Sequence, residues 1–514
     1  MDRKSASFKT ALTGIILNLI ATVLGFITQR IFINTLGVEY TGINGTYGNI
    51  LSILTLSDLG VGVAVIYHLY GALAKNDKKR IAALMHFYHK ACRIVAGVVL
   101  LGGAALLPFA KVFVGENNVP DNLYIIFGLY VIIASLQYIL NYRRALLSAD
   151  QRGYVINTVM IGATTILYFV KIAVLLITGN FYLYAIAIII EKLAENLIIN
   201  HIVKKRYPYI LEPAKLEKST RTDIKKKMYA SIYHNSASYV VNFTDNTIIA
   251  QFFGAAQVGL YVNYYMIVSA INTLIAQVFN GVVASLGNIL AAEGHNRLYP
   301  VTKSIFFLNF WIYAVVSIAT YFCLPSFVAM WIGPEYWLPN IVVAAVVLNM
   351  FVQGMRFTAN NTLSVGGIIF ENRFVPVMEA VINLTTSIIL GKLIGMAGIF
   401  IGTILSNLFL HIYSYPKYAF GLVLKRKRIE YIGLFTKYLA IFLISWLGMS
   451  LLFKLVVIDN NFAQFLLNGF LSIVIPSLCY WVIFHRTEEY RYVSALLKEY
   501  FKKFAHRLAR IYQK

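Results

Sequence analysis

Positively charged side chains lie inside long apolar stretches of this chain, at Arg30, Lys90, Arg93 and Arg356. A charge in the middle of such a stretch costs about 2.5–3.5 kcal/mol when the stretch crosses a bilayer, so each cation should face a cavity or a partner. Cations in a cavity bind anions, and the guanidinium fork suits phosphate. We therefore predict that these four residues bind an anionic substrate. Three alternatives stay open: Arg30 and Arg93 form structural ion pairs, Lys90 extends to the membrane surface, or Arg356 pairs with Glu379.

Carboxylates and a histidine form a second set of ionisable groups within the apolar stretches. The candidates for ion coupling or gating are Asp58, Glu191, Glu195, His234 and Asp245. Glu191 and Glu195 are four residues apart and share one helix face. Paired carboxylates in that position hold a proton or a sodium ion. The alternative is that they pair with Lys171 or Lys192.

The composition requires a membrane environment. Of the 514 residues, 59% are hydrophobic and only 13% are charged, whereas soluble domains carry about 25% charged residues. The mean hydropathy is +0.68. A net charge of +23 would suggest nucleic acid in a soluble protein, but here it marks loops that face anionic lipid, and no nucleic-acid partner is expected.

Apolar runs of about 20 residues, the length that crosses a bilayer, recur along the whole sequence. We predict fourteen transmembrane helices in an all-α polytopic membrane protein. Most Lys and Arg residues lie in alternate loops, and only Lys111, Lys392 and Lys454 lie in the others. By the positive-inside rule, both termini are cytoplasmic. The absence of a cleavage site after the first run predicts that this run stays as a span.

One long polar segment divides the chain. The predicted domains are an N-terminal lobe of six spans, a basic cytoplasmic linker, a C-terminal lobe of six spans, two further spans, and a basic amphipathic tail, at 1–203, 204–228, 229–424, 425–485 and 486–514. The alternating charges, Pro and Thr of the linker predict a flexible, solvated segment.

A short glycine turn occurs once in each half. Gly37-Val-Glu-Tyr-Thr-Gly42 resembles Gly254-Ala-Ala-Gln-Val-Gly259, and each follows an apolar run with one charge, Arg30 or Asp245. This echo predicts a duplicated gate whose two copies carry opposite charges.

Motifs for catalysis and for cofactors are missing from the sequence. It contains no phosphate-binding loop, no HExxH and no serine elbow. The three cysteines lie in apolar runs without metal-ligand spacing. We expect no enzyme activity, no metal and no cofactor other than a coupling proton or sodium ion.

Two stretches carry a family resemblance. RIFINTLGVEYTGINGTYGNILSILTLSDLG and DNTIIAQFFGAAQVGLYVNYYMI resemble the signatures of bacterial polysaccharide flippases (the Wzx or RfbX-like group) of the multidrug/oligosaccharidyl-lipid/polysaccharide (MOP) exporter superfamily. The resemblance implies two six-helix lobes around a central cavity, with two further helices alongside. It also implies that Arg30 matches an essential arginine of the first span.

The same resemblance implies a function and partners. The chain would move undecaprenyl-diphosphate-linked oligosaccharide from the inner to the outer leaflet of the bacterial inner or plasma membrane by alternating access. Its partners would be that lipid-linked oligosaccharide, membrane lipids, and polysaccharide polymerase and assembly proteins. The alternative within the superfamily is a drug or cation antiporter, which needs acidic rather than basic cavity residues.

Overall fold

The computed structural model describes residues 3–54, 61–368, 371–456, 458, 460–496 and 498–499. Within these ranges some side chains are not described, chiefly those of 229–243 and most of those of 280–296. The chain separates into two compact units, Met1–Val262 and Asn263–Lys514. We call them the first unit and the second unit.

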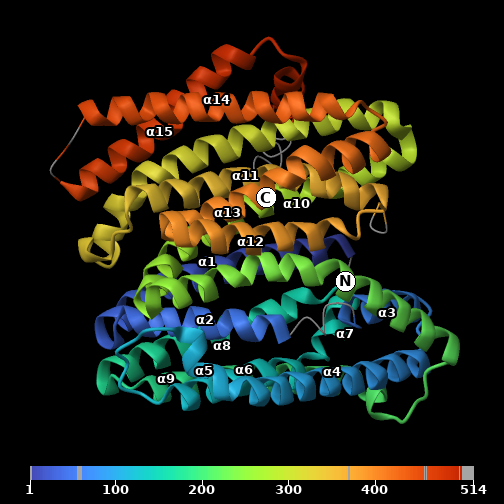
Figure 1. The fold of residues 1–514 in the computed structure, drawn as a ribbon. Helices are drawn as coiled ribbons and strands as arrows, with labels where there is room; N and C mark the ends of the chain where they lie inside the picture. Colours follow the sequence, from blue (N-terminus) through green and yellow to red (C-terminus); the bar gives the residue numbers. More distant parts are fainter. Residues whose placement is uncertain are drawn as a thin grey trace, which may run out of the picture. The chain divides into compact units, whose positions relative to one another are not determined.

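The described secondary structure of the first unit consists of helices joined by short connections (Figure 1). Its helices are α1 (Arg3–Leu36), α2 (Val38–Leu54), α3 (Val61–Ala74), α4 (Lys78–Leu106), α5 (Ala110–Val114), α6 (Leu123–Asn141), α7 (Arg144–Ala149), α8 (Gly153–Thr178), α9 (Phe181–Arg206) and the first part of α10 (Lys218–Trp331). Helix α1 packs along α8, α4 packs along α6, and α9 contacts both α6 and α8. Side-chain caps such as Asn180, whose Oδ1 accepts from Leu183 N at 3.1 Å, begin several of these helices.

The second unit continues the helical architecture. It contains the rest of α10, α11 (Asn340–Gly366), α12 (Val375–Ile394), α13 (Met396–Phe409), the π-helical segment η5 (Leu410–Val423), α14 (Arg428–Leu455) and α15 (Asn461–Phe484). Helix α13 packs on both α11 and α12, and α14 packs on η5. Stacked aromatic rings join α14 to its neighbours: Phe351 lies 3.9 Å from Phe442 and Phe310 lies 4.5 Å from Tyr438, measured between ring centroids.

The membrane prediction agrees with this architecture. Ten helices of the described residues are long and apolar enough to cross a membrane, and two shorter apolar helices, Val61–Ala74 and Leu123–Ile139, accompany them. Large apolar side chains are exposed along them, for example Leu101 at 73% and Ile177 at 82%, as expected where lipid is the solvent. The chain is an all-helical polytopic membrane protein. The predicted lobe limits stay predictions.

The segment after α9 differs from the flexible linker that its charges predicted. Tyr207 and Ile210 are only 6% and 5% exposed, and both belong to a core cluster with residues of α3, α4 and α7. The Tyr207 hydroxyl donates to Asp150 Oδ2 at 2.5 Å. Burial and this hydrogen bond raise the pKa of Tyr207. Ile224, near the start of α10, is fully buried in the same cluster. The apolar side chains between the charges therefore dock the linker on the first unit.

A docked linker should resist proteolysis. We expect trypsin to cut the folded protein slowly between Lys204 and Lys227, although this segment is rich in Lys and Arg. Ile210→Asp buries a carboxylate among apolar side chains, which is unfavourable, and should speed cleavage there at least tenfold. Mass spectrometry of timed digests measures the rate. Leu211→Asp is the matched control, because Leu211 is 55% exposed; equal cleavage rates in both variants would contradict docking.

Candidate functional site

Two glycine turns lie where the sequence echo predicted them. Gly37 separates α1 from α2 with φ +95°, and Gly254 has φ +79° within α10. Both values lie in the left-handed region, which glycine enters without the steric cost of a Cβ. The N–H of Gly37 donates to Ile33 O at 2.9 Å, which ends α1. The N–H of Ala255 donates to Glu116 O at 3.0 Å, so the turn at Gly254 is held by the segment that follows α5.

The helices that follow the two turns cross at glycines. A Cβ added to Gly42 would lie 1.9 Å from Ala255 O, and a Cβ added to Gly259 would lie 2.0 Å from Val38 O. The contact is reciprocal: the sixth residue of each turn motif meets the second residue of the other motif. The two copies of the motif are thus packed against each other, backbone to backbone, within the first unit.

The two charged residues near these turns differ in their surroundings. Arg30 is exposed on α1, and its side chain is engaged in a contact. Asp245 and its neighbour Asn246 are both 7% exposed, and Asp245 is also engaged. Of the other gating candidates, Asp58 lies outside the described residues, and so does the side chain of His234.

A stripe of basic side chains runs along α4. His86, His89, Lys90 and Arg93 are spaced i, i+3, i+4 and i+7, which places them on one side of the helix. Lys90 and Arg93 are exposed, whereas His86 and His89 are partly buried. Among the described residues, none of the four forms an ion pair with a carboxylate. The positive charge of this stripe is uncompensated there.

The paired carboxylates on α9 are neutralised by basic side chains. Glu191 lies 3.1 Å from Lys171 Nζ on α8 and 3.7 Å from Lys192 Nζ. Glu195, only 1% exposed, lies 3.6 Å from Lys192 Nζ and 3.1 Å from Arg144 Nη2 on α7. The pairing alternative for these two carboxylates is confirmed, and their role in ion coupling stays a prediction.

Arg144 is the member of this network that the sequence analysis missed. Arg143 and Arg144 lie between two predicted spans, where the positive-inside rule predicts solvated loop cations, yet Arg143 is 8% exposed and Arg144 is bonded to a buried carboxylate. The signal that could have revealed this is Ala145-Leu146-Leu147, directly after the arginines. Three apolar residues in a row are typical of a buried segment, and all three are buried.

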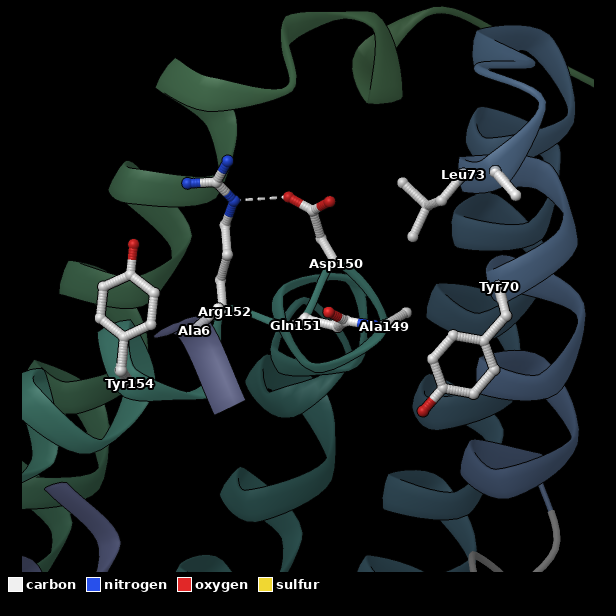
Figure 2. Close-up of a pocket in the computed structure, with 9 residues that line it drawn as sticks. Ala6, Tyr70, Leu73, Ala149, Asp150, Gln151, Arg152 and Tyr154 are labelled. Carbon is white, nitrogen blue, oxygen red and sulfur yellow. Dashed lines mark hydrogen bonds and ion pairs between the residues drawn. The ribbon is translucent and has the colours of Figure 1, made fainter. Parts of the chain in front are cut away.

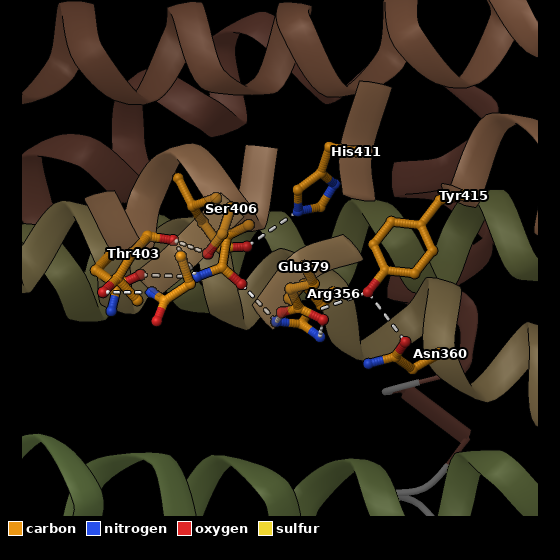
Figure 3. Close-up of polar contacts among 11 residues, drawn as sticks. Arg356, Asn360, Glu379, Thr403, Ser406, His411 and Tyr415 are labelled. Atoms are coloured by element: carbon orange, nitrogen blue, oxygen red, sulfur yellow. Dashed lines mark hydrogen bonds and ion pairs between the residues drawn. The ribbon is translucent and has the colours of Figure 1, made fainter. Parts of the chain in front are cut away.

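A second polar network lies in the second unit and centres on Arg356 (Figure 3). The guanidinium of Arg356 on α11 donates to Glu379 Oε1 on α12 at 2.6 Å, to Asn407 Oδ1 at 2.5 Å and to Tyr415 OH at 3.1 Å. Tyr415 donates in turn to Asn360 Oδ1 at 3.0 Å. Glu379 is 2% exposed, so the charges of this pair compensate each other in the interior. The alternative that Arg356 pairs with Glu379 is confirmed; its predicted substrate role stays a prediction.

A cavity of about 350 Å³ opens at the turn between α7 and α8 (Figure 2). Asp150 and Arg152 lie in its wall, joined by a 2.6 Å ion pair, together with Tyr70 and Tyr154. Gln151, with φ +57°, forms the turn. Because Asp150 also accepts from Tyr207, the charges of this cavity are used in fixing the turn and the linker. Among the described residues, no group of three or more His, Cys, Asp or Glu side chains is placed to hold a metal ion.

Solved structures share this arrangement of helices. The lipid II flippase MurJ in an inward closed conformation is similar with a TM-score of 0.62 and 13% identity, covering 92% of this chain and 100% of its own. A MOP superfamily transporter from Pyrococcus furiosus, described as having a binding pocket of reverse polarity, is similar with a TM-score of 0.57 and 12% identity. The similarity covers 84% of this chain and 97% of that transporter. A mutant of the Vibrio cholerae MATE transporter VcmN is similar with a TM-score of 0.53 and 14% identity, over 79% of this chain and 94% of VcmN.

The fold is that of the MOP superfamily of transporters. The MurJ flippase and the MATE transporter VcmN are therefore similar to this chain in fold. No protein-family model matches the chain, and no curated protein sequence matches it. At identities of 12–14% these structures define the MOP fold and leave the substrate to be argued from this chain's own residues.

Proposed function

We propose that this MOP-fold transporter is a flippase for oligosaccharide linked to a polyprenyl diphosphate. Its place would be a bacterial inner or plasma membrane, with both termini in the cytoplasm and with polysaccharide polymerase and assembly proteins as partners. The cycle would be alternating access between two lobes, in which the diphosphate binds to Arg30, Arg93 and Lys90 of the first unit.

The observation that carries this proposal is the distribution of compensated and uncompensated charge. The buried carboxylates Glu191, Glu195 and Glu379 all form ion pairs. An organic cation would therefore have to break an existing pair to bind to any of them. Lys90 and Arg93, in contrast, have no carboxylate partner among the described residues. A phosphate group would neutralise these two cations and accept charge-assisted hydrogen bonds from them.

Asp245 remains the candidate for gating. It is buried in the helical run that precedes Gly254, and Asn246 beside it lies close to Gly45 on α2, where an added Cβ would be 3.1 Å from Asn246 Nδ2. In the proposal, Asp245 serves the contact that closes the crossing or takes up the coupling ion. Tight packing supports a closure role because small displacements there are costly.

The test of the flippase proposal is glycan export by variants of α4. Arg93→Ala removes charge-assisted hydrogen bonds worth about 1.5–3 kcal/mol, so we expect export to fall by about 10- to 100-fold, with lipid-linked repeat units accumulating in the inner leaflet. Lys79→Ala is the matched control, an exposed cation at the start of the same helix. Normal export by Arg30→Ala, and by an Arg93→Ala Lys90→Ala double variant, would exclude cationic anchoring.

The drug or cation antiporter is the competing function, and MATE transporters share the fold. Expression of this protein in a strain without its own efflux pumps separates the two. Drug resistance that disappears in a Glu195→Gln variant would favour the antiporter. Unchanged drug sensitivity together with restored export would favour the flippase.

A further inference from the structure

Arg143 is a buried cation at the junction between α6 and α7. Its side chain is only 8% exposed, and its Nε is buried without a hydrogen-bond partner in the described part of the chain. No carboxylate of the described residues forms an ion pair with it. Arg144 next to it has its charge compensated by Glu195. Tyr142 contacts the guanidinium through a side-chain hydrogen bond and through its ring, but a neutral tyrosine does not neutralise the charge. Arg143 therefore has no counter-ion among the described residues, which is unfavourable in an interior position unless a ligand supplies one.

The surroundings connect Arg143 to the basic stripe of α4. The ring of Tyr142 stacks on His89, with centroids 4.4 Å apart and planes 21° from parallel. The guanidinium of Arg143 lies over the Tyr142 ring at 5.1 Å. Arg143 and the α4 stripe therefore form one region of positive potential.

Further unpartnered polar atoms lie at the same helices. His86 Nδ1 on α4 and Arg144 Nε on α7 are buried without hydrogen-bond partners, as is Arg143 Nε. Native interiors leave few polar atoms unsatisfied. A guanidinium Nε–H can only donate, so the Nε atoms of Arg143 and Arg144 each require an oxygen acceptor.

We propose that Arg143 is a direct ligand of the diphosphate group and forms, with Lys90 and Arg93, a site selective for diphosphate over monophosphate. This inference rests on the proposed function, since it adds a residue and a selectivity to the site on α4. A diphosphate carries more negative charge and more acceptor oxygens than a monophosphate, and the three cations match it. The planar fork of Arg143 suits such oxygens better than an ammonium group does.

The experiment measures binding by calorimetry with the full chain in lipid nanodiscs. The probes are inorganic pyrophosphate, inorganic phosphate, geranylgeranyl diphosphate and geranylgeraniol, so that a free diphosphate and a lipid-linked one are distinguished. The variants are Arg143→Met, Arg143→Lys and Arg93→Met. Arg206→Met is the matched control, an exposed arginine at the end of α9. The melting temperature of each ligand-free variant is recorded as well.

Arg143→Met should weaken pyrophosphate binding by at least about tenfold while leaving phosphate binding nearly unchanged. It should also leave the ligand-free melting temperature equal or raise it, because an uncompensated buried charge is replaced by an apolar side chain of similar length. Arg143→Lys should restore part of the affinity. Arg206→Met should resemble the wild type in both measurements.

The failing outcomes differ for the two proposals. If Arg143→Met binds pyrophosphate like the wild type while Arg93→Met loses binding, Arg143 is not a ligand and the flippase proposal stands. If Arg143→Met melts at a lower temperature or does not fold, Arg143 is structural, and the inference is wrong. If the wild type binds neither pyrophosphate nor geranylgeranyl diphosphate, the flippase proposal fails and the inference fails with it.

Discussion

Replacement of Gly42 by alanine should prevent the two turn motifs from packing as they do and should abolish transport. A Cβ at Gly42 would lie 1.9 Å from the carbonyl oxygen of Ala255. That atom is backbone, so no side-chain rotation relieves the clash, and the helices must move apart. Overpacking of this kind costs about 1–3 kcal/mol. Gly259→Ala should act alike, because its Cβ would lie 2.0 Å from Val38 O.

Gly48→Ala is the matched control for this prediction. Gly48 lies on the same helix α2, and a Cβ there would meet nothing within 4 Å. Since alanine is about 1 kcal/mol better than glycine within a helix, this variant should be neutral or slightly stabilised.

The arrangement of the crossing can be read independently of transport. Glu39 and Ala256 line one hollow beside the crossing. In a background without native cysteines, Glu39→Cys and Ala256→Cys should be joined by a short bismaleimide. The yield should fall in Gly42→Ala and stay high in Gly48→Ala. Full crosslinking and full transport in Gly42→Ala would show that the crossing is not needed in the cycle.

The turns illustrate what local sequence could predict. The motif alone predicts turns at Gly37 and Gly254, because glycine enters the left-handed region without the steric cost of a Cβ. That Gly42 and Gly259 face each other's backbones was not predictable from one motif, since it depends on how two distant helices cross. The repeated motif indicated a duplication. The sixth residue of each copy is glycine because the backbone of the other copy lies too close to leave room for a Cβ.

For the ionisable residues, the sequence predicts which side chains are unusual but not which partners they take. Apolar context correctly marked Glu191, Glu195, Arg356 and Glu379 as special, and pairing was one of the alternatives for each. Which partner each would take depended on helix packing: Glu195 took Arg144, a residue counted as part of a loop. Loop charge counts assume solvated loops, and α7 folds its arginines inward instead. The docked linker was missed for the same reason, because charge dominated the pattern while Tyr207 and Ile210 determined the packing.

Arg356→Met separates the two roles that remain for Arg356. If its role is to neutralise Glu379, the variant leaves a carboxylate that is 2% exposed without its cation, which should cost about 3–5 kcal/mol of stability. The expected result is a large drop in the melting temperature of the purified protein. Arg428→Met is the matched control, because Arg428 is an exposed cation at the start of α14.

The double variant Arg356→Met Glu379→Met should recover most of that loss. Removing both charges together leaves no uncompensated ion, and replacement of a whole buried ion pair by apolar side chains is often neutral. The two changes should therefore couple strongly in a double-mutant cycle. A role in substrate binding gives the opposite pattern: Arg356→Met would keep its stability and lose glycan export, and Glu379→Met would not restore it. A stable but inactive Arg356→Met variant would therefore support a role of Arg356 in binding the phosphate groups of the substrate.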